Sequence, residues 1–394
     1  MSPATDSVLT INGGSSSIKF ALYLIGKSLS KNLSGKIERI GLSGTTLTYF
    51  DAGNAQKNSV AIEAGDFSSA ANALITWLEP QLAKTRLLAI GHRVVHGMRH
   101  GKPELVTQML LDELHQISSY DPEHLPLEIR LIEIFQQHYP TQPQVACFDT
   151  AFHHTLPRVA KILPIPHRYE AFGLQRYGFH GLSYQYLMQE LERLAGRDIA
   201  QGRVILAHLG NGASMAAVHK GQSKDTSMGF TPSGGLVMGT RTGDIDPGVA
   251  AYLMQSEKLT PAQFNHLINH ESGLLGISEL SSDMHDLTVL AATDKRAADA
   301  VELFCYQVKK CIGAYAAALG GLNTLVFSGG IGENAADIRA RICTGLAFLG
   351  VDIDTQRNAN NTGVTSTDKG QVSVYVIHTD EELMIAKSVC LFLE

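Results

Sequence analysis

The sequence lacks several features that mark whole classes of protein. Lys and Arg number 32 against 38 Asp and Glu, a net charge of −6 with no basic block, which argues against nucleic acid as a partner. No stretch reaches roughly 18 uninterrupted apolar residues, and the N-terminus lacks the basic and long apolar segments of a secretory signal. The five cysteines are scattered and form no C-x-x-C, which favours reduced thiols over a disulfide framework. We therefore expect a soluble cytoplasmic protein with no nucleic-acid or membrane partner.

Two common nucleotide-binding motifs are missing as well. No G-x-x-x-x-G-K-[ST] follows a strand and no G-x-G-x-x-G opens a helix, so neither a P-loop nor a Rossmann fold is indicated. The 394 residues exceed the size at which one hydrophobic core usually stops growing, which predicts two domains. Short apolar strands alternate with helical periodicity, which indicates an α/β fold with mixed sheets. The expected strands are Val8–Ile11, Leu88–Val95, Val145–Phe148, Val204–Ala207, Thr324–Ser328 and Val372–Ile377, and the expected helices are Leu127–Gln137, Leu182–Leu194 and Arg296–Leu319.

A repeated pattern is the most informative feature that is present. An apolar strand runs into a Gly/Ser turn and a second strand follows directly, first in Val8–Tyr23 and again in Val204–Val218. Glycines allow tight folding and close approach to a ligand, and the exposed N–H and hydroxyl groups can surround an anion. A third Gly-rich turn, in Thr324–Ile342, passes from a strand into a helix, whose N-terminus also favours phosphate. Together the three turns predict a nucleotide held between two related halves.

Charged residues of the kind that phosphoryl transfer needs are distributed among these turns. The reaction requires cationic groups that match the charge on the phosphoryl oxygens and a magnesium ion held by carboxylates. Asp149 directly follows an apolar strand, and Arg241 lies in a Gly-rich stretch, which are usual positions for ligand-binding groups. Arg93, His180 and Glu381 complete the set.

Two pairs of histidines could suggest zinc. His92 and His96 lie in a segment rich in β-branched residues, and in an extended strand their rings would be about 13 Å apart, too far for one ion. His153 and His154 are adjacent and point to different sides of most backbones. We interpret at most one of that second pair as structural and neither as a ligand.

Eight segments, in this order and with this spacing, resemble the acetate kinase family. The resemblance extends from about Val8 to Ala386, and Asp225–Gly248 is its longest and most specific part. The segments are INGGSSSIKF, GHRVVHG, FDTAFHHTLP, YGFHG, HLGNGAS, DTSMGFTPSGGLVMGTRTGDIDPG, FSGGIGEN and TDEEL.

The resemblance implies a fold, an activity and an assembly. The fold would be that of actin-like ATPases: two RNase H-like domains with mixed sheets flanked by helices and a cleft between them. Residues 1–149 with 383–394 would form the N-terminal domain, and residues 150–382 the nucleotide-binding domain. The reaction would be reversible phosphoryl transfer from ATP to acetate, giving ADP and acetyl phosphate, with Mg²⁺ or Mn²⁺ as cofactor. The protein would be a homodimer.

The same resemblance implies roles for individual residues. Arg93 and Arg241 would grip the carboxylate and the transferring phosphoryl group, His180 would stabilise the transition state, and Asp149 matches the acidic residue described as catalytic. Asn12 and Glu381 would belong to the magnesium site. The residues expected to bind the nucleotide are Lys19, His208, Leu209, Gly210, Asn211, Gly212, Asp283, Met284, His285, Gly330, Ile331, Gly332, Glu333 and Asn334.

This chain departs from the family pattern at two positions. Met98 replaces a glycine in HGMRHGK, which changes a loop near the expected substrate entrance. His285 in SSDMHDL stands where the family usually has an arginine near the nucleotide. Because arginine is permanently charged and forked whereas histidine is neither at neutral pH, nucleotide binding should depend less on a fixed charge here.

Two alternative functions remain open. A nucleotide switch of the same architecture would have no use for the set Arg93, His180 and Arg241, which therefore favours a kinase. A propionate kinase differs only in the size of the acyl pocket. If the segment of Arg93 is extended, Val95 points to the same side and forms the floor of that pocket, which favours acetate. Asp149 is not expected to act as a base, because the carboxylate substrate is already ionised at neutral pH. At a strand end beside the Gly-rich turns, it is better suited to hold magnesium, directly or through water, and to fix Arg93 or Arg241 by a charge-assisted hydrogen bond.

Overall fold

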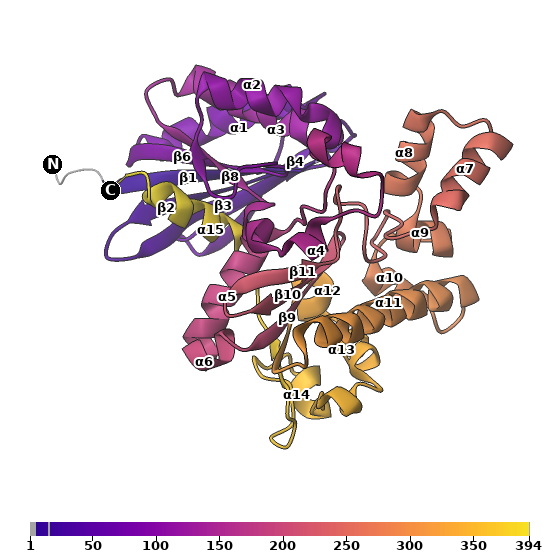
Figure 1. Cartoon of the computed structure of the whole chain (residues 1–394). Coiled ribbons are helices and arrows are strands. Elements are labelled where there is room, and N and C mark those ends of the chain that lie inside the picture. Colours follow the sequence, from indigo (N-terminus) through magenta and orange to yellow (C-terminus); the bar gives the residue numbers. More distant parts are fainter. Residues whose placement is uncertain (1–4, 15, 394) are drawn as a thin grey trace. The chain divides into compact units, whose positions relative to one another are not determined.

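A computed structural model describes residues 5–14 and 16–393 of the chain. The described residues form two compact units (Figure 1). The first contains the residues up to Ala151 and those from Asp380 on, and the second is Phe152–Thr379. The domain limits inferred from the sequence stay a prediction, because compactness alone does not define a domain.

The described part of the first unit contains an eight-stranded mixed sheet. Its strand order is β5-β4-β3-β2-β1-β6-β8-β7, with β1 antiparallel to β2 and parallel to β6, which is in turn parallel to β8. The strands are β1 (Asp6–Gly13), β2 (Ile18–Ile25), β3 (Leu29–Glu38), β4 (Thr46–Asp51), β5 (Gln56–Ala61), β6 (Arg86–Val94), β7 (Glu104–Leu105) and β8 (Gln144–Phe148).

Helices cover both faces of this sheet. They are α1 (Phe67–Leu82), α2 (Gln108–Gln116), α3 (Leu125–His138) and α15 (Glu381–Cys390). Leu9 and Ile11 of β1 form a core with Leu74 of α1 and Phe135 of α3. The opposite face packs on α15, which Figure 1 shows in yellow beside β1 and β2. Gly91 permits this contact, because a Cβ there would lie 2.4 Å from the side chain of Ile385.

The described part of the second unit contains a five-stranded mixed sheet of order β11-β10-β9-β12-β13. β9 is antiparallel to β10 and parallel to β12, which is parallel to β13. Both units therefore contain the same local arrangement. A strand is followed by a turn and a second, antiparallel strand, and on its other side the first strand has a parallel neighbour. The strands are β9 (Arg203–Leu209), β10 (Ala213–His219), β11 (Gln222–Thr226), β12 (Thr324–Ser328) and β13 (Ser373–Val376).

The longest helix of the second unit, α11, packs on its sheet. Its buried stripe includes Val301, Phe304, Val308 and Ile312, at the three- and four-residue steps of an amphipathic helix. The helices of this unit are α4 (Arg158–Lys161), α5 (Gly181–Ala195), α6 (Arg197–Ala200), α7 (Pro247–Ser256), α8 (Pro261–His270), α9 (Gly273–Ser278), α10 (Met284–Leu290), α11 (Lys295–Leu319), α12 (Gly329–Asn334), α13 (Ala336–Cys343) and α14 (Thr355–Ala359).

The main elements predicted from the sequence are confirmed. The two strand-turn-strand segments are β1–β2 and β9–β10, and the third Gly-rich turn leads from β12 into α12. One boundary was wrong: β6 ends at Val94, and Val95 lies in a bend, so strict strand alternation does not determine where its side chain points. Among the described residues, no helix is both long and apolar enough to cross a membrane.

Candidate active site

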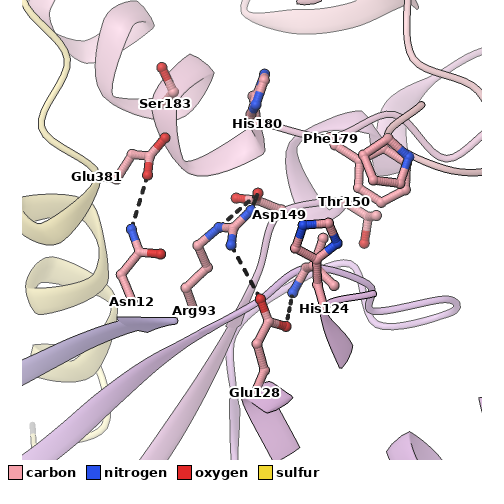
Figure 2. A network of polar contacts seen from close by, with 12 residues as sticks. Asn12, Arg93, His124, Glu128, Asp149, Thr150, Phe179, His180, Ser183 and Glu381 are labelled. Carbon is pink, nitrogen blue, oxygen red and sulfur yellow. Dashed lines mark hydrogen bonds and ion pairs between the residues drawn. The ribbon is translucent and has the colours of Figure 1, made fainter. Parts of the chain in front are cut away.

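In the first unit, Arg93 is held by two buried carboxylates. From β6, its Nε and Nη2 donate to Oδ2 of Asp149 at 2.9 and 2.6 Å, and Nη1 donates to Oε1 of Glu128 at 3.2 Å (Figure 2). Asp149 directly follows β8, and Glu128 belongs to α3. The side chain of Arg93 is 14% exposed, while those of Asp149 and Glu128 are 0% and 2% exposed. The guanidinium is therefore fixed in orientation and still partly accessible.

Burial and neighbouring charges shift the pKa values of Arg93 and Glu128 in opposite directions. Burial opposes the charge of Arg93, but the attraction of Asp149, Glu128 and Glu381 outweighs it and raises the pKa of Arg93. Burial also raises the pKa of Glu128 to about 8, against the attraction of Arg93 and a hydrogen bond of 2.7 Å from the Val95 N–H. Arg93 remains a cation, and Glu128 can take up a proton near neutral pH.

Asn12 and two glutamates lie together at the start of α15. Nδ2 of Asn12 donates to Oε2 of Glu381 at 3.1 Å and to Oε1 of Glu382 at 3.4 Å. Burial and the charge of Glu381 raise the pKa of Glu382, while the cation of Lys19 opposes this rise. Lys19, on β2, pairs with Asn12 across the sheet. Carboxylate and amide oxygens are suitable ligands for magnesium.

A magnesium ion would find few protein ligands at this place. Within residues 5–14 and 16–393, no three His, Cys, Asp or Glu side chains are grouped as a metal site. Magnesium usually keeps several waters and is bound through one or two carboxylates together with substrate phosphates. The donor set of Asn12 and Glu381 fits that mode of binding.

In the second unit, His180 and Arg241 converge on the glycine turn after β9. A Cβ on Gly212 would lie 3.4 Å from Nε2 of His180 and 3.9 Å from Nη1 of Arg241. His180 precedes α5 in a left-handed conformation, with φ of 59°. The ring of His208, from β9, stacks on that of His180 with centroids 4.4 Å apart. The turn is thus lined by two imidazoles and a guanidinium, the groups that a phosphoryl anion needs.

A cavity of about 460 Å³ lies in the second unit next to this turn. Gly210 and Gly330 bring its two Gly-rich segments together, because a Cβ on Gly210 would lie 3.6 Å from the Gly330 nitrogen. Apolar side chains and backbone N–H groups around it suit a nucleotide base and sugar. It is lined by eight predicted nucleotide-binding residues, Gly210, Asn211, Asp283, Met284, His285, Gly330, Ile331 and Asn334, and by Thr288, Val289, Ala335 and Asp337.

Other predicted nucleotide-binding residues support the cavity without lining it. Leu209 is fully buried in the sheet, and Gly332 is buried in α12. Oε1 of Glu333 accepts the backbone N–H groups of Gly329 at 2.8 Å and Thr379 at 3.2 Å, and Oε2 contacts Nδ1 of His378 at 2.6 Å. The carboxylate of Glu333 therefore holds backbone in place.

Comparisons with known proteins agree over the whole chain. Residues 7–387 match the Acetokinase family. Acetate kinase from Rhodopseudomonas palustris is 43% identical and propionate kinase from Citrobacter rodentium is also 43% identical, covering 98% and 97% of this chain and 98% and 96% of those proteins. The crystal structure of Porphyromonas gingivalis acetate kinase superposes with a TM-score of 0.88 at 35% identity, covering 99% of this chain and 100% of that one.

The chain belongs to the acetokinase family.

Family membership establishes the fold class and the type of reaction. The α/β fold with two mixed sheets is the actin-like ATPase fold expected from the sequence. The protein is a phosphotransferase whose acceptor is a carboxyl group. Because acetate and propionate kinases are equally similar to it, sequence identity alone does not select the acyl chain.

The structure shows the surroundings of the two residues that depart from the family pattern, Met98 and His285. Met98 has φ of 48°, a conformation that glycine adopts more easily, and its N–H donates to Nδ1 of His96 at 3.1 Å. His285 is exposed in the first turn of α10 and lines the cavity. The N-cap of that helix is Asp283, whose carboxylate accepts the His285 N–H at 2.7 Å.

His92 and His153, one histidine of each pair, are buried and make polar contacts. Nε2 of His92 contacts Oε1 of Gln144 at 2.6 Å, and burial lowers the pKa of His92 to about 4. His153 is buried and bonded to Ser223 and to the Phe179 carbonyl, whereas His154 is exposed. One histidine of the second pair is therefore structural, as predicted.

Sequence reasoning missed Glu128 and the polar partners of the two stacked histidines. Glu128 lies on the apolar face of α3 with Leu125 and Ile132, and a carboxylate on such a face is a signal that periodicity could have revealed. Hydroxyl groups of the Gly/Ser turns were expected to surround an anion, but that of Ser214 is buried against Nδ1 of His180 at 2.8 Å. No local sequence pattern indicates that contact.

Proposed function

We propose that this protein catalyses reversible, magnesium-dependent phosphoryl transfer from ATP to acetate. The observation that carries the proposal is the convergence of Nε2 of His180 and Nη1 of Arg241 on Gly212, beside a cavity of about 460 Å³ lined by the Gly-rich turns. Donors placed where charge develops are the main requirement of phosphoryl transfer, since the reaction needs little covalent chemistry from the protein.

Each group then has a defined task. Arg93 binds the acetate carboxylate, and Asp149 holds the guanidinium in place. His180 and Arg241 stabilise the charge of the phosphoryl group during transfer. Asn12 and Glu381 would hold Mg²⁺, which neutralises charge on the phosphates. No general base is required, because the attacking carboxylate is already ionised at neutral pH.

Acetate is proposed over propionate because of Val95. Val95 is 2% exposed, and its N–H is bound to Glu128, which also contacts Arg93, so the residue is fixed close to the group that binds the carboxylate. A pocket closed by valine accepts a methyl group more easily than an ethyl group, with about 1–3 kcal/mol of discrimination per methylene.

Trapping the acyl phosphate with hydroxylamine tests the activity and the acyl length together. With ATP and Mg²⁺, we expect hydroxamate from acetate, a kcat/KM for propionate lower by at least about fivefold, and a shift toward propionate in Val95→Ala. Absence of hydroxamate with every short acid would contradict the activity. Equal kcat/KM for acetate and propionate would contradict the role of Val95 and favour a broad short-chain kinase.

We also propose that the protein is a homodimer that uses helix α7. This helix has the apolar sequence GVAAYLM but contains no buried residue, and Val249 and Tyr252 are 44% and 69% exposed. Figure 1 shows α7 beside α8 at one end of the second unit. An apolar helix left uncovered is typical of a protein interface, and a second copy of the chain offers the same apolar helix in return.

A further inference from the structure

The two stacked histidines of the second unit have the same kind of partner. Nδ1 of His180 contacts Oγ of Ser214 at 2.8 Å, and that hydroxyl is also hydrogen-bonded to the phenol of Tyr184. Nδ1 of His208 contacts Oγ of Ser183 at 2.8 Å, and Ser183 contacts Oγ1 of Thr379 at 2.8 Å. Each ring therefore meets a serine that is backed by a second hydroxyl.

A third contact between a histidine and a serine shows which atom carries the proton. Nδ1 of His153 contacts Oγ of Ser223 at 2.9 Å, and Nε2 contacts the carbonyl oxygen of Phe179 at 3.0 Å. A carbonyl only accepts, so Nε2 carries the proton. Burial lowers the pKa of His153 to about 4, so the ring is neutral at pH 7 and its Nδ1 accepts from Ser223.

The phenol of Tyr184 orders the hydrogen bonds at His180 in the same way. A phenol is a better donor and a poorer acceptor than an aliphatic hydroxyl, so Tyr184 donates to Ser214. The proton of Ser214 then points to Nδ1 of His180, which places the ring proton on Nε2. That is the nitrogen nearest the Gly212 turn.

At His208 the same order requires that Thr379 donates to Ser183 and Ser183 to Nδ1. The main chain of Thr379 is itself held, since its N–H donates to Glu333 at 3.2 Å. Glu333 belongs to α12, next to residues that line the cavity. The hydroxyl pair of Ser183 and Thr379 is thus connected to the turn that is expected to face the nucleotide.

We propose that Ser214 with Tyr184, and Ser183 with Thr379, are positioning residues that keep His180 and His208 in the Nε2–H tautomer. Two stacked rings then present N–H donors, and not lone pairs, to an oxyanion on the turn. The two imidazoles lie together near Arg241. If aspartates were bound to Nδ1 in place of the serines, they would favour two imidazolium charges beside the guanidinium, whereas neutral hydroxyl partners do not. The part of this inference that names phosphoryl oxygens rests on the proposed function.

A double-mutant cycle tests whether Ser214 acts through His180. We expect Ser214→Ala and Tyr184→Phe to lower kcat about tenfold, less than loss of the donor itself, with KM for ATP changed less than about twofold. In a protein that already carries His180→Ala, Ser214→Ala should cost nothing more. The matched control is Tyr177→Phe, which removes a phenol of similar burial that donates to the Gly173 carbonyl. Additive losses would overturn the proposal.

A second double-mutant cycle tests whether the hydroxyl pair of Ser183 and Thr379 acts through His208. Thr379→Val removes Oγ1 but keeps the N–H that binds Glu333, and Ser183→Ala removes the hydroxyl between Thr379 and His208. Both should lower kcat, and neither should add to His208→Ala. Thr365→Val is the control, since Thr365 is 1% exposed and its hydroxyl donates to the Val374 carbonyl of the same unit at 3.3 Å.

Nitrogen NMR of the histidine-labelled protein reads the tautomers without any reaction. We expect the Nε2–H form for His180 and His208 in the wild type, with His153 as an internal reference for that form. Signals are assigned from their loss in His180→Ala and His208→Ala, and Ser214→Ala should alter the His180 signals alone. A wild-type Nδ1–H form at both rings overturns the inference even if the enzyme is active. An inactive wild type with both rings in the Nε2–H form contradicts the proposed function and supports the tautomer assignment.

Discussion

At the scale of single residues, the grouping of Arg93, Asp149 and Glu128 determines the properties of the proposed acceptor site. One guanidinium faces two carboxylates that are almost fully buried, and burial raises the pKa of Glu128 to about 8. Asp149 makes the shorter and doubled contact with Arg93. We therefore assign the alignment of Arg93 to Asp149 and a pH-dependent effect on stability to Glu128.

Replacing Asp149 tests alignment against proton transfer. Asp149→Asn leaves the buried Arg93 with a weaker partner, and we expect kcat to fall by about a hundredfold or more, with partial recovery at high Mg²⁺ or Mn²⁺. Because no proton leaves the substrate, log kcat of the variant should not rise with pH. The control is Asp6→Asn, which breaks the exposed pair with Arg86 in the same unit. If kcat falls at acidic pH in the wild type but not in the variant, and added metal does not restore the activity of the variant, Asp149 acts as a proton acceptor.

Replacing Glu128 tests the effect of burial on stability. Its pKa is about 8 in the folded protein against an ordinary 4.5, so between these pH values the folded state binds more protons than the unfolded state. The free energy of unfolding should fall over that interval, by at most about 1.4 kcal/mol per pH unit. Glu128→Gln removes this loss, so its stability relative to the wild type should increase from pH 5 to pH 9 in denaturant titrations.

Glu133→Gln, on the exposed side of the same helix, provides the control for that measurement. A stability difference between Glu128→Gln and the wild type that stayed constant with pH would show that Glu128 is ionised throughout in the folded protein.

At the scale of elements, the turns were predictable and the contacts between them were not. Gly/Ser sequences between apolar runs predicted β1–β2, β9–β10 and the entry to α12, because strand and turn propensities are local. The partners of the two stacked histidines are distant in sequence: Ser214 is 34 residues from His180, and Ser183 is 25 residues from His208. Such pairs depend on register and packing, which single-sequence patterns do not contain.

Helix α10 provides a test of nucleotide binding at this scale. His285 lines the cavity in the first turn, where the family usually has arginine. A permanent charge there should lower KM for ATP in His285→Arg by up to about fivefold, the value of an exposed ion pair, and less at high salt. Nucleotide selectivity among ATP, GTP and ITP should narrow. The control is His167→Arg, an equally conservative change at an exposed histidine away from the cavity. Unchanged KM and selectivity would remove the argument.

At the scale of the whole molecule, two units built around similar strand-turn-strand segments divide the work. The first carries Arg93, Asn12 and Glu381, and the second carries the cavity proposed to bind the nucleotide, with His180 and Arg241. The C-terminal helix α15 explains how the last residues join the first unit: Glu381 begins the helix that packs on β1 and β6. Periodicity did not predict this helix, and the return of the C-terminal residues to the first domain was expected only by resemblance, because the contact is long-range.

The assembly state is the remaining property at this scale. If α7 pairs with a second copy, a charge in its exposed face must separate the two chains, because desolvating an unpaired carboxylate in an apolar interface is strongly unfavourable. We expect the wild type to have the mass of a dimer by light scattering at micromolar concentration, and Tyr252→Glu or Val249→Glu to have the mass of a monomer. The control is Phe348→Glu, a residue 78% exposed elsewhere in the second unit, which should leave the mass unchanged. A wild type that is monomeric, or a dimer that persists in both α7 variants, contradicts the assignment of this face.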